Sequence, residues 1–194
     1  MSMTKYQDEM YKFITSTENF EAVCDLVDEF PLMKQRLLEE FWLEVRDSLQ
    51  REIMRFEAWK IWNGITDKSN PAITIYRDEF CFEKANDAKV AIRIEHLMDT
   101  PWYGLFVNRK MSTFDFKDIW AKATELKLSE FKIGRIDGWW WPLYQTLPYN
   151  FTQTRDIQRL MLPERENLIK EIVAAIKHTM DKLAGFAESY FIPK

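Results

Sequence analysis

The sequence contains two histidines and two cysteines among its 194 residues, which limits the chemistry that the chain can perform. Cys24 and Cys81 lie far apart and form no metal-binding spacing, so we expect two free thiols. Neither His96 nor His178 has a cysteine or a carboxylate at ligand spacing. We therefore expect no bound metal, and a structural or surface role for both histidines.

Glycine is also scarce: the five glycines are not grouped, which excludes a phosphate-cradling loop and a dinucleotide fingerprint. The sequence has no Gly-x-Ser-x-Gly nucleophile elbow and no Cys-x-x-Cys pair. No run of about eighteen apolar residues is long enough to span a bilayer, and the charged first residues do not form a signal peptide. We expect a cytoplasmic protein with no cofactor and no membrane partner.

The composition otherwise fits a folded protein, with 46% hydrophobic and 15% aromatic residues. A chain of this length buries about 70% of its unfolded surface and needs no disulfides or metal to fold. The net charge of −4 argues against a general polyanion binder, because neutralising phosphates is what gives such proteins their affinity. Local basic patches remain compatible with this charge.

Three of the eight tryptophans stand in a row, Trp139 to Trp141, between Gly138 and Pro142. Pro142 favours extended backbone angles for the residue before it, so we expect a strand or an extended edge rather than a helix. In that geometry Trp139 and Trp141 share one face and Trp140 takes the other. We favour a role in the core for this run. The alternative is a platform that stacks on a base, a sugar or an arginine.

The N-terminal part has the apolar spacing of helices. It predicts two short amphipathic helices, from Thr4 to about Ser16 and from Phe20 to Phe30, and then a longer helix from Pro31 to about Trp59. The second helix has an acidic outer face, which we interpret as a solvated surface, with a docking surface as the alternative. We assign residues 1–62 to this helical part.

Alternating and β-rich runs follow after turn residues at Asn63-Gly64 and 69–71. The predicted strands cover residues 72–76, 79–82, 89–97, 102–108 and 131–136, and then the tryptophan run. Helices are predicted over 114–126, over 155–160 and from Pro163 onward. The sequence thus predicts an α+β fold with a central antiparallel sheet of about 4–6 strands, N-terminal helices and a long C-terminal helix. We assign residues 72–194 to the α+β part and expect one structural domain in all.

One enzymatic pattern occurs, the Asp/Glu-x-Lys triplet of PD-(D/E)XK nucleases, in which carboxylates hold magnesium and a lysine helps to orient water. Asp87 with Lys89 and Glu130 with Lys132 are the triplets near predicted strands. No Pro-Asp precedes either pair, and a motif this short arises by chance in a charged chain. We keep these four as weak catalytic candidates, for a magnesium-dependent nuclease, and favour a protein without catalytic activity.

The order of aromatic motifs carries a family resemblance. Phe41-Trp42 on a long helix, strands at 73–76 and 90–94, Trp102 to Leu105, Trp139 to Pro142 and a closing helix follow one another. This order resembles the region after the catalytic core in bacterial and phage proteins of the PD-(D/E)XK nuclease-like superfamily. The core itself is not evident here, so no catalytic residue is transferred. The resemblance implies a recognition domain that stands alone, with a role in phage–host conflict, in defence or anti-defence.

We therefore expect an interaction protein that binds another protein through aromatic residues, since tyrosine and tryptophan anchor protein interfaces. The candidate binding residues are Trp102, Tyr103, Trp139, Trp140, Trp141 and Tyr144. The alternative is a reduced nuclease-like protein that binds nucleic acid, with rings that stack on bases and phosphate contacts from basic residues. These basic residues are Arg93, Arg109, Lys110, Lys132 and Arg135. A third option is a small-ligand pocket beneath the tryptophans.

Overall fold

The structure, a computed structural model, describes residues 4–67, 71–81, 88–108, 116–134, 141–161 and 163–191. The chain divides into two compact units, Met1–Leu37 and Leu38–Lys194. In the first unit, α1 (Lys5–Ile14) begins with a capping box. The Thr4 hydroxyl accepts a hydrogen bond from the Gln7 amide at 3.3 Å, and the Gln7 side chain accepts one from the Thr4 amide at 2.8 Å.

A single helix, α2 (Thr17–Ile53), replaces the two helices predicted on either side of Pro31. The prediction that a helix ends before Pro31 was wrong. Proline has no N–H for the carbonyl four residues earlier, that of Val27, yet it only weakens a helix when strong helix-forming residues continue on both sides. The first part of α2 belongs to the first unit, and the part from Leu38 belongs to the second.

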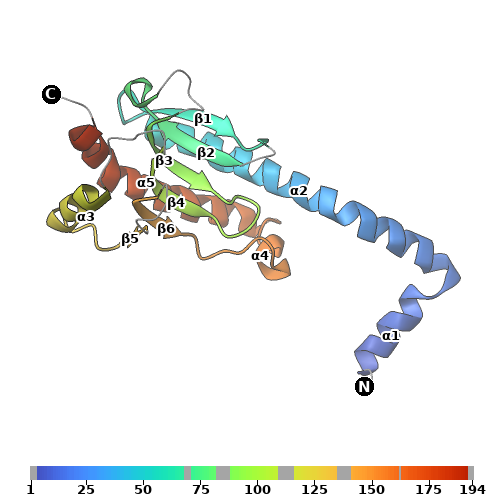
Figure 1. Cartoon of the computed structure of the whole chain (residues 1–194). Helices are drawn as coiled ribbons and strands as arrows, with labels where there is room; N and C mark the ends of the chain where they lie inside the picture. The colour runs from blue at the N-terminus through green and yellow to red at the C-terminus, as the bar shows by residue number, and fades with distance from the viewer. Residues whose placement is uncertain are drawn as a thin grey trace. The chain divides into compact units, whose positions relative to one another are not determined.

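The second unit is built on one open sheet of six strands (Figure 1). The strands are β1 (Lys60–Gly64), β2 (Ala72–Tyr76), β3 (Val90–Glu95), β4 (Trp102–Val107), β5 (Lys132–Ile133) and β6 (Leu143–Thr146). Their spatial order is β1-β2-β3-β4-β6-β5, and every neighbouring pair is antiparallel. This sheet, together with a long C-terminal helix, confirms the predicted α+β fold.

Two long helices cover one face of this sheet, α5 (Glu164–Phe191) and the C-terminal part of α2 (Figure 1). The two helices run in the same direction, because the ion pairs between them follow one another in ascending residue order on both helices. These pairs are Glu44 with Arg165 at 2.5 Å and Glu52 with Lys177 at 2.8 Å, and Arg55, just after α2, contacts Asp181 at 2.7 Å. The smaller helices are α3 (Phe116–Glu125) and α4 (Thr154–Gln158).

The core lies between these helices and the sheet. Phe41 and Trp42 on α2 are fully buried, and both rings meet Phe151 edge-on at about 6 Å. The indole N–H of Trp42 donates to the Leu97 carbonyl at 2.7 Å, which ties α2 to the β3–β4 turn. Phe41 and Trp42, two residues of the predicted long helix, therefore fix that helix against the segments that follow β3 and β6.

Several predicted elements differ from the structure. The strand predicted over 79–82 is a short 3-10 helix at Asp78–Phe80, followed by a single bridge from Cys81 to Ala88. β1 was missed because the helix prediction ran to Trp59, whereas α2 ends at Ile53 and Ala58 takes a φ of 66°. The helix predicted from Pro163 onward is α5, which begins at Glu164 and continues to Phe191.

Candidate functional site: an aromatic row on the sheet

Strand alternation gives the sheet two different faces. One face carries the fully buried side chains Ile73, Ile75, Ile92, Ile94 and Leu105, and α5 packs against their strands. The other face carries Trp62, Tyr76, Trp102, Phe106 and Tyr144, which we call the aromatic face. All of its rings except that of Phe106 are half-buried. This face therefore presents aromatic surface to solvent.

Three neighbouring rings, those of His96, Trp102 and Tyr144, form what we call the aromatic row; His96 is exposed and the other two are half-buried. The indole of Trp102 stacks on the Tyr144 ring with centroids 5.1 Å apart and planes 23° apart. The His96 ring lies on the other side of Trp102, at 5.1 Å and 51°. Stacked rings of this kind are held rigid by each other, so they lose little side-chain freedom when a partner binds.

Gly104 lets the backbone of β6 lie close to β4 beside the row. It lies opposite Tyr144 in the register of the two strands. Its φ of 152° is rare for other residues, and a Cβ would come within 2.3 Å of the Leu143 carbonyl oxygen. The close pairing of the two strands that carry Trp102 and Tyr144 therefore depends on a glycine in mid-strand.

An ion pair lies beside the row. Arg93 Nε approaches Glu95 Oε1 at 2.9 Å, and the guanidinium stacks over the Phe106 ring at 4.7 Å. The approach lacks the angle of a hydrogen bond, so the pair is a charge contact. Burial lowers the pKa of Arg93, and the charge of Glu95 opposes that shift. Arg93 therefore has a charge partner beside the row, and its role as a phosphate contact stays a prediction.

Tyr103 and Trp141, two of the predicted binding residues, are buried. Tyr103 lies on the helix face, 5% exposed, and its hydroxyl donates to Gln145 at 2.5 Å. Trp141 is 4% exposed and meets Phe106 edge-on, in a small cluster on the aromatic face that includes Ala91. For Trp141 the interpretation as a core residue holds. Trp139, Trp140, Arg109, Lys110, Arg135 and Asp87 lie outside the described residues.

The described members of the nuclease triplets are held by other contacts. Glu130 lies in the turn before β5, and its Oε1 is 3.1 Å from Nε2 of His178 on α5. Lys132 donates from Nζ to the Thr146 hydroxyl at 3.4 Å. Lys89 precedes β3, and its amide donates to the Phe80 carbonyl. Within the described ranges, no three histidine, cysteine, aspartate or glutamate side chains gather to hold a metal.

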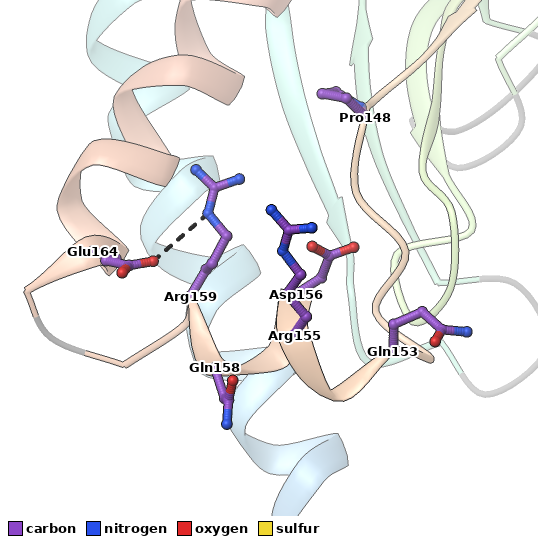
Figure 2. A pocket seen from close by; sticks show the side chains of 7 residues that line it. All are labelled: Pro148, Gln153, Arg155, Asp156, Gln158, Arg159 and Glu164. Atoms are coloured by element: carbon purple, nitrogen blue, oxygen red, sulfur yellow. Dashed lines mark ion pairs between the residues drawn. The ribbon is translucent and has the colours of Figure 1, made fainter.

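A polar pocket of about 690 Å³ lies between α4 and the start of α5 (Figure 2). Two of its charged residues have partners within the protein. Arg159 contacts Glu164 at 3.8 Å and Glu171 at 3.4 Å, and it stacks over Tyr149 at 4.9 Å. Asp156 accepts a hydrogen bond from the Asn150 amide at 2.7 Å. The pocket is lined by none of the tryptophans, so it is distinct from the pocket that the sequence analysis placed beneath them.

His96 is the part of the row that the sequence analysis did not include. It directly follows β3 with a φ of 59°, a left-handed conformation that turns the chain toward β4. The pairing of Glu95 with Trp102 then brings the imidazole next to the indole. A signal was present in the sequence, because a hairpin between the predicted strands 89–97 and 102–108 brings these positions together.

The geometry defines the class: an α+β protein with an open antiparallel sheet, two long helices on one face and an aromatic row on the other. Comparisons with protein-family models, with curated proteins and with solved structures found no match to this chain. No helix in the part of the chain that the structure describes is long and apolar enough to cross a membrane.

Proposed function

We propose that this protein is a non-enzymatic recognition protein that binds another protein through the aromatic row. The observation that supports the proposal is the stacked, half-buried pair of Trp102 and Tyr144 on the sheet face opposite α5. Tryptophan and tyrosine supply large contact areas at low entropic cost, which is why they dominate binding energy at protein interfaces. A role in phage–host conflict extends this proposal on the strength of the family resemblance.

The charges favour a protein partner over nucleic acid. The chain carries a net charge of −4. Arg93, a basic residue beside the row, is already paired with Glu95. Non-specific nucleic-acid binding draws its affinity from the neutralisation of phosphates, which a paired arginine supplies poorly. An amphipathic peptide or an arginine-bearing protein surface fits stacked rings better.

The test is an affinity purification from native host lysate with the full-length protein as bait. Wild type is compared with Trp102→Ala, Tyr144→Ala and the control Met161→Ala, which removes an apolar side chain that is 56% exposed and outside the row. Each lysate is used with and without nuclease, and bound proteins are quantified by mass spectrometry. We expect a stoichiometric partner that survives nuclease and is at least tenfold depleted by both row variants, since hot-spot truncations cost about 2 kcal/mol or more.

Circular dichroism of each variant separates lost binding from lost folding. Equal recovery of the partner by wild type and by folded Trp102→Ala would contradict the proposal. Acrylamide quenching of tryptophan fluorescence supplies an independent check, because Trp102→Phe should reduce the quenched fraction. If that fraction did not change, Trp102 would be inaccessible and the row would belong to the core.

The second candidate is a nucleic-acid-binding protein of reduced nuclease type, and the position of one lysine beside the aromatic row favours it. Lys132 is paired in register with Tyr144, so an ammonium group flanks the stacked rings. Titration with a fluorescent single-stranded oligonucleotide tests it. Affinity should fall steeply with salt, and Lys132→Gln should reduce the slope of log K against log[salt] by about one. An affinity that stays flat with salt would exclude this candidate, and so would an unchanged slope.

A cleavage assay with magnesium completes this comparison. If the oligonucleotide is cut, Asp87→Ala and Glu130→Ala should abolish cutting, as expected for carboxylates that hold magnesium. Cutting that persists in both variants would assign the activity to a contaminant.

A further inference from the structure

The first unit, Met1–Leu37, has no buried side chain among those described. Large apolar residues on both of its helices are exposed instead: Tyr6 at 70%, Met10 at 39%, Tyr11 at 60%, Phe13 at 57%, Leu26 at 57%, Val27 at 64%, Phe30 at 52%, Leu32 at 62% and Met33 at 58%. Helices as short as α1 are marginal in water without packing. This unit therefore needs a partner surface for its apolar side chains.

Five apolar residues of α2 repeat at the spacing of a coiled coil. Val23, Leu26, Phe30, Met33 and Leu37 are separated by three, four, three and four residues, the a and d positions of a heptad. We call these five residues the seam. This spacing places the five side chains on one side of the helix, the arrangement that a second helix packed along the first requires.

The charges around the seam fit a second copy of the same segment in the opposite direction. In an antiparallel pair, a residues of one helix face d residues of the other, so Phe30 faces Met33 and Leu26 faces Leu37 of the second copy, while Val23 lies opposite Glu40 at the edge of the overlap. That register also brings Glu29 opposite Arg36 of the second copy, and two-fold symmetry makes this contact twice. The seam from Leu26 to Leu37 and its flanking charges are therefore self-complementary.

A parallel pair fits the charges poorly. Residues 18–29 carry five carboxylates and no basic side chain. Parallel helices would place these two acidic stretches side by side and align their dipoles, and both effects are unfavourable. The antiparallel arrangement separates the acidic stretches and opposes the dipoles.

We propose that the first unit is a self-association module, in which the seam pairs antiparallel with the seam of a second copy of this chain. The seam covers fifteen residues, about 21 Å of helix, which is short for a coiled coil on its own. The apolar stripe of α1, Tyr6, Met10 and Phe13, supplies the additional area as the outer helices of a four-helix bundle. This module is separate from the aromatic row and goes beyond the proposed function.

Sedimentation equilibrium of the full-length protein tests the proposal, in reducing buffer so that exposed Cys24 forms no disulfide. We expect a dimer at micromolar concentration. Phe30→Glu places a charge in the seam and should weaken dimerisation at least a hundredfold. Leu32→Glu makes the same change at an equally exposed position beside the seam and should leave the dissociation constant within about threefold.

A charge swap tests the register without disturbing the helices. Glu29→Arg and Arg36→Glu should each weaken the dimer roughly fivefold by like-charge contact, and the double variant should restore it.

The proposal would be overturned if the wild-type protein stayed monomeric even at a concentration 100-fold above the micromolar range. It would also be overturned if the Phe30→Glu variant still formed the dimer. A double swap that fails to restore the dimer would overturn the antiparallel register. Row variants such as Trp102→Ala should leave the dimer intact, so the two proposals fail separately.

Discussion

Gly104 lies in mid-strand on the aromatic face, where a side chain would collide with β6. A Cβ at this position would approach the Leu143 oxygen to 2.3 Å and the Tyr144 Cα to 2.7 Å. We expect Gly104→Ala to lower the free energy of unfolding by about 3 kcal/mol, through strain at positive φ and through displacement of backbone. Urea denaturation followed by fluorescence measures the loss.

Gly185 provides the matched control for that substitution. It lies in the interior of α5 with open space around its Cα. Gly185→Ala should raise the free energy of unfolding by about 0.5–1 kcal/mol, because alanine is the better helix former. If both variants changed stability in the same direction, the close approach at Gly104 would not be the cause.

Tyr149 gives a prediction about pH. Its hydroxyl donates a hydrogen bond to Glu171, and burial together with this bond raises the pKa of Tyr149 to about 12. The folded state thus holds the phenol proton more tightly than the unfolded chain, whose tyrosine pKa is about 10. The resulting stabilisation is complete below about pH 10 and is lost as the pH rises toward 12.

Urea denaturation between pH 8 and 11.5 measures this effect. Tyr149→Phe should lose stability relative to wild type at pH 8, and the difference should shrink above pH 10. Tyr6→Phe, which alters a ring that is 70% exposed, should follow the wild-type curve throughout. A constant difference between Tyr149→Phe and wild type would show that the phenol proton is not linked to folding.

At the residue scale, the sequence predicted part of the site. Trp102 and Tyr144 were among its binding candidates and form the stacked pair, whereas Tyr103 lies under the helices. Alternation tells which residues share a face, but not which face the helices cover, because both faces of β4 are largely apolar. The ion pair of Arg93 with Glu95 was likewise not predicted, because the sequence alone does not distinguish two paired charges on a strand from ordinary surface charges.

Among the elements, α2 contains an internal weak point at Pro31. The proline leaves the Val27 carbonyl without its helical hydrogen bond. Pro31→Ala should restore that bond and slow amide exchange over residues 28–35 by on the order of a hundredfold, the equivalent of about 3 kcal/mol of helix propensity. Hydrogen exchange followed by mass spectrometry measures these exchange rates directly. Met33→Ala should show no such slowing, and unchanged exchange in Pro31→Ala would place the weak point elsewhere.

The attachment of α2 to the sheet depends on Trp42. Its buried N–H donates to the Leu97 carbonyl, so Trp42→Phe removes packing and leaves a buried acceptor without its donor. We expect a loss of about 2–3 kcal/mol in the free energy of unfolding, measured by urea denaturation. Lys177→Met breaks an exposed ion pair with Glu52 and should fall within experimental error. A larger loss of stability in Lys177→Met than in Trp42→Phe would contradict this expectation.

The elements themselves were mostly predictable, where they are long and periodic. The strands at 72–76, 89–97 and 102–108 and the closing helix were found because their apolar patterns are unambiguous. β1 was not, since Phe56 and Trp59 continue the helical spacing of α2 and only the turn at Ala58 interrupts it. The continuity of α2 through Pro31 was missed because a sequence rule treats proline as an end, while the energetic cost is finite.

For the whole molecule, the division at Leu37 predicts how truncated proteins behave. The second unit contains every buried side chain described, so a chain without residues 1–36 should fold as a monomer with near-ultraviolet circular dichroism. A chain ending at Met161 lacks α5 and exposes the apolar face formed by Ile92 and Ile94. It should give no cooperative unfolding transition. This division would be contradicted if the chain ending at Met161 folded, or if the chain without residues 1–36 did not.

The sheet order has a consequence for synthesis. β4 pairs with β6, which the ribosome makes about forty residues later, and α5 emerges last. Until then a nascent chain presents the unpaired edge of β4 and an uncovered apolar face on β3, the combination that promotes aggregation. The central strands therefore stay incompletely paired and covered until β6 and α5 have been made, so the sheet is completed late in folding.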